Sequence, residues 1–137
     1  MADPGGVVER FFDRLTARDW PGLGALLAED VERVGPFGDR AVGRTRYVDL
    51  LRGLVPDDYG NDVHRITYAP DGRSAFARVT EHLVYPHGTF HLEEAYAFEI
   101  GESGSIDRLE VFWQTPDTDP GGFGSATSEE SYASPDA

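Results

Sequence analysis

The stretch SAFARVTEHLVYPHGTFHLEEAYAFEI, residues 74–100, alternates apolar and polar side chains along two long arms. Alternation with a period of two is typical of β-strands that bury one face, and a proline and a glycine between the arms favour a turn. The segment therefore predicts an antiparallel hairpin. The side chains expected on its buried face are Ala75, Ala77, Val79, Leu83, Tyr85, Phe90, Leu92, Tyr96, Phe98 and Ile100.

The register of this hairpin depends on the length of its loop. A four-residue loop over residues 86–89 pairs Leu83 with Leu92 and places apolar side chains opposite one another. The same register puts Glu81 directly opposite Glu94, both on the apolar face. A loop that differs by one residue would turn one arm over and separate the two acids.

Two carboxyl groups that meet in a partly dry cavity cannot both ionise at low cost. One of them is therefore expected to keep its proton toward neutral pH, which gives an acid and a base side by side. Such a pair can move a proton between two positions of an enolisable substrate, or activate water while protonating a leaving oxygen. Alternatively, a bulge turns one glutamate outward, or an arginine neutralises both, and the pair has no catalytic role.

Outside the hairpin, helical spacing of apolar residues dominates the first third of the chain and strand patterns dominate the rest. We expect helices over residues 4–17, from Trp20 toward residue 30, and over residues 45–54, and further strands near residues 31–37, 62–69 and 106–115. Three helices on one face of a curved, mostly antiparallel sheet form an α+β, cone-shaped domain whose concave face encloses a pocket.

The chain of 137 residues is long enough for one domain and too short for a second core. We assign that domain to residues 1–116. Residues 117–137 contain five acids, no base and no Val, Leu, Ile or Met, so we predict an acidic, Ser/Gly-rich disordered tail.

Composition excludes several classes of function. A net charge of -13 repels phosphate backbones and anionic lipids, so neither nucleic acid nor a membrane is expected as a partner. The chain has no cysteine and no lysine, which removes disulfides, thiolate chemistry and Schiff bases. Because it also lacks a long apolar run and a signal-peptide pattern, we predict a cytoplasmic protein.

The order of short motifs in the first half of the chain resembles a known superfamily. These motifs are Val7-Val8 through Phe12, Asp19-Trp20, Leu23, Leu26-Leu27, Asp30-Val31 and Gly43-Arg44 at the start of a helix. Across about residues 5–116 the chain is similar to nuclear transport factor 2-like proteins, and within them to the bacterial SnoaL-like group. The resemblance implies a polyketide cyclase or ketosteroid isomerase-like fold, and it implies that a homodimer is common.

Ketosteroid isomerases of this superfamily use an aspartate base on the first strand, and a tyrosine and a protonated aspartic acid as oxyanion donors. In an ungapped alignment, these three positions are Gly35, Phe11 and Tyr96. The resemblance therefore does not imply a steroid isomerase of that mechanism.

Two polar side chains outside the hairpin are further candidates. Arg33 neutralises the acids or holds a substrate carboxylate if Gly35 faces inward, whereas it is solvated if Val34 faces inward. His64, which alternates with Ile66 and Tyr68 on an expected strand, is a second candidate base or a structural residue.

The pocket wall is expected to be apolar and aromatic. Its predicted members besides Arg33 are Phe11, Phe37, Val79, Phe98, Val111 and Trp113. Walls of this kind suit flat hydrophobic ligands, although any small core has a similar composition.

We therefore predict an acid/base enzyme of isomerase, cyclase, dehydratase or hydrolase type, with no cofactor and no metal. Glu81 and Glu94 are the expected proton-transfer pair, with Tyr96 as donor to a developing oxyanion and His64 as a further catalytic candidate. The expected substrate is a hydrophobic cyclic or polyketide-like molecule. The alternative is a non-catalytic domain that binds a small molecule or only dimerises.

Overall fold

The computed structural model describes residues 6–114, so the predicted acidic tail lies outside the described residues. The elements in chain order are α1 (Val7–Ala17), α2 (Trp20–Gly24), β1 (Leu27–Val34), β2 (Arg40–Val42), α3 (Arg44–Leu54), β3 (Asp58–Tyr68), β4 (Ser74–Tyr85), β5 (Gly88–Ile100) and β6 (Ile106–Trp113).

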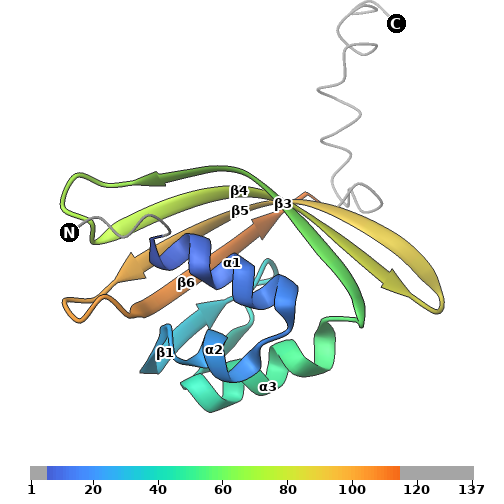
Figure 1. Cartoon of the computed structure of the whole chain (residues 1–137), viewed down its shortest axis with the longest axis horizontal. Coiled ribbons are helices and arrows are strands. Elements are labelled where there is room, and N and C mark those ends of the chain that lie inside the picture. Colours follow the sequence, from blue (N-terminus) through green and yellow to red (C-terminus); the bar gives the residue numbers. More distant parts are fainter. Residues whose placement is uncertain (1–5, 115–137) are drawn as a thin grey trace, which may run out of the picture.

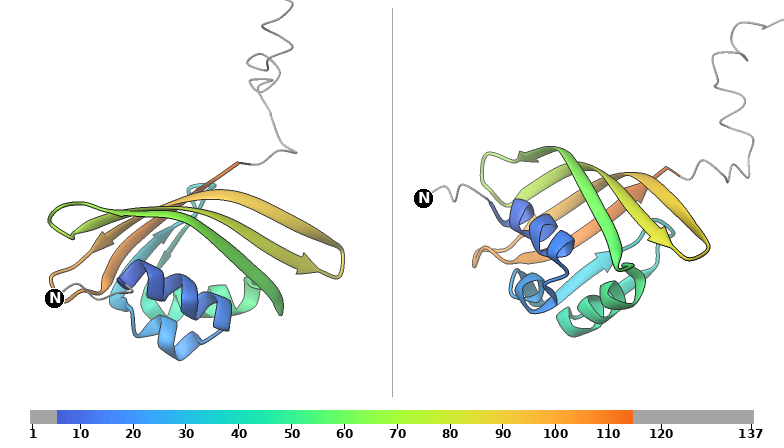
Figure 2. Two further views of the ribbon diagram at one scale, coloured as in Figure 1. Left: turned by 45° about the horizontal axis from the view of Figure 1, so that its top comes forward. Right: turned by 45° about the vertical axis from the view of Figure 1, so that its right-hand side comes forward.

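The six strands form a single sheet in the order β2-β1-β6-β5-β4-β3. The contact between β1 and β6 is parallel, and every other pair is antiparallel. The sheet curves around the three helices, which all lie on its concave side (Figure 1; Figure 2). The predicted α+β class and cone shape are confirmed.

Local sequence explains where the helices begin and end. In α1, five apolar side chains recur at helical spacing and are all buried, and the helix stops at Arg18, which adopts a left-handed conformation. The Asp19 side chain accepts the backbone N–H of Gly22 at 2.9 Å and so caps α2, with Pro21 in the first turn. α3 ends two residues before Pro56, which cannot continue a helix.

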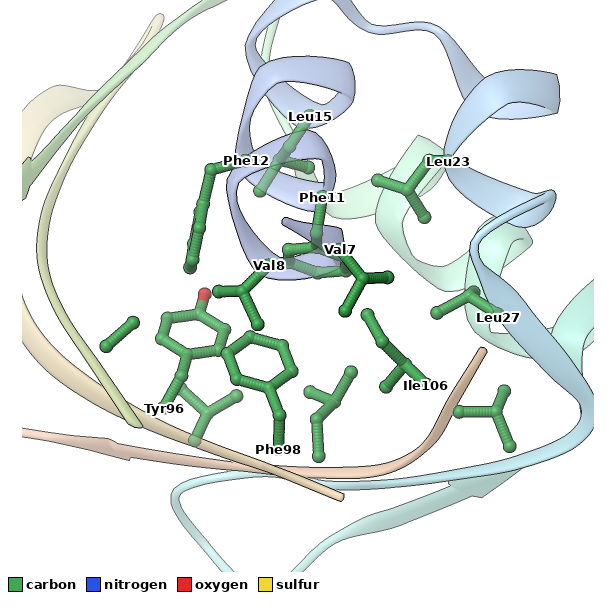
Figure 3. Packing of buried hydrophobic residues seen from close by; sticks show 14 of the residues in the cluster. Val7, Val8, Phe11, Phe12, Leu15, Leu23, Leu27, Tyr96, Phe98 and Ile106 are labelled. Carbon is green, nitrogen blue, oxygen red and sulfur yellow. The ribbon is translucent and has the colours of Figure 1, made fainter. Parts of the chain in front are cut away.

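Aromatic rings join α1 to the sheet at the centre of the core (Figure 3). The Phe11 ring lies edge-on to Phe98, with 5.6 Å between centroids, and the Phe12 ring lies edge-on to Tyr96 at 5.1 Å. All four residues are buried. This packing fixes the depth at which the inner face of β5 meets the helical layer.

Several element bounds differ from the sequence prediction. β1 begins at Leu27 and not near residue 31, because α2 is short and Leu27 packs in the core as a strand residue. The segment expected as a loop over residues 38–44 contains β2, which pairs with the end of β1. β3 begins at Asp58, four residues before the prediction, because the Pro56 to Gly60 region continues directly into the strand.

The hairpin register also differs from the prediction. Tyr85 pairs with Gly88, so the loop contains only Pro86 and His87, and Glu81 lies opposite Leu92. The register is shifted by two residues relative to the predicted one. Because side chains alternate with a period of two, this shift leaves both inner faces as predicted. Glu81 and Glu94 are therefore diagonal neighbours on the concave face, since Glu94 pairs with Val79.

Candidate active site

A cavity of about 330 Å³ opens between the concave face of the sheet and helices α1 and α3. Its walls are mostly apolar. The lining residues are Leu15, Arg33, Tyr47, Leu51, Leu54, Val55, Tyr59, Glu81, Leu83, Tyr85, Phe90, Leu92, Glu94, Tyr96, Val111 and Trp113. A pocket of this size and composition suits a small organic ligand.

The two glutamates are the buried acids of this cavity. Glu81 on β4 is 8% exposed and Glu94 on β5 is 6% exposed. Both point to the concave side, because they share the parity of Val79 and Tyr96 on their strands. The structure therefore brings together the predicted pair, with a diagonal contact in place of a direct cross-strand one.

Glu81 is held by two tyrosines. The Tyr59 hydroxyl donates to Oε2 of Glu81, and the Tyr96 hydroxyl donates to Oε1 at 3.1 Å. Asn61 in turn donates from Nδ2 to the Tyr59 hydroxyl at 3.2 Å and to Oγ1 of Thr16 at 2.9 Å. A carboxylate that accepts a phenol proton on each oxygen has its negative charge well compensated.

Glu94 has the opposite environment. Its Oε1 atom is buried and has no hydrogen-bond partner within the described part of the chain. Burial, followed by the nearby Glu81 carboxylate, raises the pKa of Glu94 far above the ordinary value of 4.5. Glu94 therefore keeps its proton at neutral pH and presents a carboxylic acid to the cavity.

The phenols around the pair also keep their protons. Burial is the largest cause that raises the pKa of Tyr47, Tyr59 and Tyr96, and the negative charge of Glu81 adds to it in each case. All three side chains line the cavity. They can therefore act as hydrogen-bond donors at neutral pH.

Arg33 faces the cavity and is not solvated, which decides between the two orientations left open by the sequence. Its Nη1 forms an ion pair with Oδ2 of Asp39 at 2.6 Å, and its charge partly opposes the rise in the pKa of Glu94. Gly35 makes this ion pair possible, because a Cβ atom there would collide with the Asp39 carboxylate and the Arg33 guanidinium. Arg33 is thus a cation in the wall beside the acid pair.

The predicted wall residues divide into three groups. Arg33, Val111 and Trp113 line the cavity as expected. Phe11, Val79 and Phe98 do not line it; they are buried in the core, where α1 packs against the sheet. Phe37 is 77% exposed in the turn after β1, and its ring lies against Trp113 with 5.5 Å between centroids.

His64 does not face the cavity, and this expectation was wrong. The pairing of β3 with β4 shifts between Val63 and Arg65, so His64 occupies a β-bulge and is exposed. Its Nε2 lies 2.6 Å from Oγ1 of Thr80, whose hydroxyl donates to Glu93. Ile66 and Tyr68 beyond the bulge do pack against the core.

Sequence reasoning missed Tyr47, Tyr59 and Asn61. Tyr47 lies in the helix expected over residues 45–54, and Tyr59 lies between that helix and the strand expected from residue 62. Tyr59 and Asn61 share the inner face with Val63, but the bulge at His64 puts this run out of phase with Ile66 and Tyr68, so alternation traced back from those two residues misses both.

Residues 6–114 contain neither a metal-binding cluster nor a membrane-spanning helix. No three His, Asp or Glu side chains in this part of the chain are arranged to hold a metal ion. None of the described helices has the length and apolar character needed to cross a membrane.

The fold and the cavity define a class of protein, namely small α+β cones that enclose an apolar pocket between three helices and a curved sheet. The chain belongs to the SnoaL-like domain family, whose family model matches residues 8–109. No curated protein matches the chain in sequence.

Solved structures of bacterial proteins share this fold. A candidate ketosteroid isomerase from Kribbella flavida is 27% identical over 90% of this chain and 86% of its own, with a TM-score of 0.71. A candidate polyketide cyclase from Xanthomonas campestris is 24% identical over 79% and 87%, with a TM-score of 0.69. A Mycobacterium tuberculosis protein in complex with estradiol-17beta-hemisuccinate is 15% identical over 79% and 91%, with a TM-score of 0.71.

Proposed function

We propose that this protein is an acid/base enzyme, with no cofactor, that acts on a hydrophobic cyclic or polyketide-like molecule bound in the cavity. The observation that carries the proposal is the pair of buried carboxyl groups, Glu81 and Glu94, in a mostly apolar cavity, where burial and Glu81 raise the pKa of Glu94. Pairs of carboxyl groups whose environments separate their protonation states are typical of acid/base sites.

In the proposed reaction, Glu94 is the acid and Glu81 is the base. For an enolisable substrate, Glu81 takes a proton from the carbon next to a carbonyl while Glu94 gives its proton to the carbonyl oxygen, which yields an enol. Glu81 then gives its proton to another carbon of the enol while Glu94 takes back the proton on oxygen.

For an epoxide, Glu81 takes a proton from water as that water attacks carbon and the C–O bond breaks, and Glu94 protonates the leaving oxygen. The proton then passes from Glu81 back to Glu94 before the next turnover. The Tyr96 hydroxyl donates to Glu81, so we assign the oxyanion-donor role expected for Tyr96 to Glu94.

The likeness to a candidate isomerase, to a candidate cyclase and to a steroid-bound relative supports this choice of chemistry and ligand class. Gly35, Phe11 and Tyr96 stand where the ungapped alignment expects the ketosteroid isomerase side chains, so the proposed chemistry depends on Glu81 and Glu94 instead.

Ligand binding can be measured through Trp113. Of the two tryptophans, Trp113 lines the cavity, whereas Trp20 lies on α2 beneath the Arg18 guanidinium, 5.3 Å from its ring centroid. We expect cyclic ketones or epoxides that enter the cavity to change the fluorescence of the native protein, and we expect this change to be lost in Trp113→Phe. The matched variant Trp20→Phe should retain it.

The same panel should then be assayed for product by mass spectrometry. Product formation from a compound that binds supports the enzyme. Binding across the panel without any turnover would contradict the catalytic proposal and favour the alternative of a non-catalytic binding domain. Absence of both would contradict the proposed ligand class.

We further propose that the protein is a homodimer joined through the convex face of the sheet. Phe76 is 63% exposed and Phe112 is 54% exposed on this face, and the small side chains Ala95 and Ala97 lie between them in the register. Exposed apolar stripes of this kind are typical of protein interfaces.

The dimer predicts a sedimentation experiment. Native protein should sediment with twice the mass of the chain, and Phe112→Asp should sediment as a monomer because it buries a charge in the interface. Phe37→Asp is the matched control, since Phe37 is also an exposed phenylalanine but lies against Trp113 beside the cavity. A monomeric native protein would rule the interface out.

The expected partners and location of the protein also remain proposals. The net charge of -13 predicts that neither nucleic acid nor an anionic membrane is a partner. A cytoplasmic location remains a prediction of the sequence.

A further inference from the structure

The Thr16–Asn61–Tyr59 hydrogen bonds lead from the exposed side of α1 to the buried acid pair. Thr16 is exposed, Asn61 and Tyr59 are half-buried on β3, and Glu81 is buried. The two acids and Tyr96 account for the proposed chemistry. That chemistry gives no role to the Asn61 amide, which donates to the Tyr59 hydroxyl.

We propose that Asn61 and Tyr59 are positioning residues that decide which carboxyl of the pair carries the proton, placing the negative charge on Glu81 and the acidic proton on Glu94. This inference rests on the proposed function for its catalytic meaning. In this proposal, the hydrogen bonds from Asn61 to Tyr59 and from Tyr59 to Glu81 determine which carboxyl group is the acid and which is the base.

The donor in each of these hydrogen bonds follows from the protons that each group carries. An amide nitrogen can only donate, and Nδ2 of Asn61 contacts both Oγ1 of Thr16 and the Tyr59 hydroxyl. The Tyr59 oxygen therefore accepts from Asn61. Its single proton is then available for its other hydrogen bond, which is to Oε2 of Glu81.

Glu81 consequently receives a proton donor on each oxygen. Tyr59 donates to one oxygen and Tyr96 to the other, an arrangement that favours a carboxylate over a carboxylic acid. Glu94 has a buried Oε1 without a partner in the described structure, so a charge there would be poorly compensated. One proton shared between the two groups is therefore placed on Glu94.

The other charged and titratable groups around Glu94 do not reverse this assignment. From β1, the Arg33 cation opposes protonation of Glu94, but Arg33 is already paired with Asp39. From β5, the Glu93 carboxylate favours protonation, and from α3 the Tyr47 phenol is neutral. Burial and Glu81 outweigh Arg33 among the causes that set the pKa of Glu94.

A neutral acid at Glu94 also narrows the ligand class. A neutral carboxylic acid can donate one hydrogen bond and can also accept, so the group that meets Glu94 is expected to be uncharged and polar, such as a carbonyl, ether or epoxide oxygen or a hydroxyl. A charged Glu94 beside Glu81 would instead favour a cationic ligand.

Carbon-13 NMR of the side-chain carboxyl carbons, on the full chain labelled at glutamate, tests the inference without any substrate. Glu81→Gln and Glu94→Gln each remove one signal and so assign the pair. Near neutral pH we expect the Glu94 carbon to show the shift of a carboxylic acid and the Glu81 carbon that of a carboxylate.

Two variants then test the positioning role. In Tyr59→Phe, the pH at which the pair loses its first proton should rise by about one to two units, because a hydrogen bond to a charged group is lost. Asn61→Leu should move it in the same direction by a smaller amount. Tyr85→Phe is the matched control, because the Tyr85 hydroxyl lines the same cavity but donates to the backbone carbonyl of Leu54 at 2.9 Å.

An ionised Glu94 in the native protein would overturn the inference. So would unchanged titration in either Tyr59→Phe or Asn61→Leu, provided that circular dichroism shows a native fold. The proposed function fails separately, because a protein with the expected NMR titration and no turnover would keep this proton arrangement while losing its enzymatic role.

Discussion

Glu94→Gln is expected to lower kcat by about 10²- to 10⁴-fold on any substrate that the native protein turns over, because this is the usual contribution of a positioned general acid. Glutamine has nearly the same size and is neutral, as Glu94 is in the native protein. Its amide can donate a hydrogen bond but cannot transfer a proton. Ligand affinity, measured through Trp113 fluorescence, should therefore change much less than kcat.

The control for this substitution is Glu99→Gln on the same strand. Glu99 is exposed on the convex face and lies 3.5 Å from Arg108, away from the cavity. It should retain native kcat and native affinity. If Glu94→Gln also kept kcat within a few-fold of native while remaining folded, Glu94 would not be the acid, and the proposed mechanism would be wrong.

The sequence predicts which side chains of a regular strand face the cavity, because side chains alternate between the two faces of a sheet. Glu81 and Glu94 reach the concave face although the predicted loop is two residues too long, because a shift of two residues preserves which side chains face inward. The exact partner of Glu81 depends on the turn at Pro86 and His87. Either a two-residue or a four-residue loop satisfies the apolar pattern, so the pattern cannot choose between them.

Parity fails where the strand is irregular. His64 shares its spacing with Ile66 and Tyr68, yet the bulge at His64 turns it to the exposed side. Nothing in the local residue types distinguishes a bulge from a regular strand. The predicted strand begins near residue 62 and therefore leaves out two residues of the site. These are Tyr59, which donates to Glu81, and Asn61, which donates to Tyr59.

Apolar residues raise a different difficulty. Phe11 and Phe98 fill the core, whereas Val111 and Trp113 line the cavity, and all four have the pattern of buried side chains. Periodicity shows that a side chain faces inward. Whether it meets a ligand or another side chain depends on how closely the helices approach the sheet at that point, which is a property of the packing as a whole.

Relative to Glu94→Gln, the native protein is expected to lose stability steadily as pH rises above the ordinary glutamate pKa of 4.5. In the unfolded chain, Glu94 releases its proton near that value. In the folded protein, burial and the Glu81 carboxylate raise the pKa of Glu94, so the native state binds one more proton than the unfolded state. Stability then falls with increasing pH, by about 1 kcal/mol per unit.

Urea unfolding of both proteins across a series of pH values measures this difference. Titrating groups far from the site are common to the two proteins, so subtracting the two free energies of unfolding isolates the Glu81–Glu94 pair. The advantage of Glu94→Gln should be smallest in mild acid and should grow through neutral pH. A difference independent of pH would mean that Glu94 ionises normally in the folded state, in which case it could not serve as a proton donor at neutral pH. A growing difference would mean that the fold retains a destabilising carboxyl group at the one position where the proposed reaction needs a neutral acid.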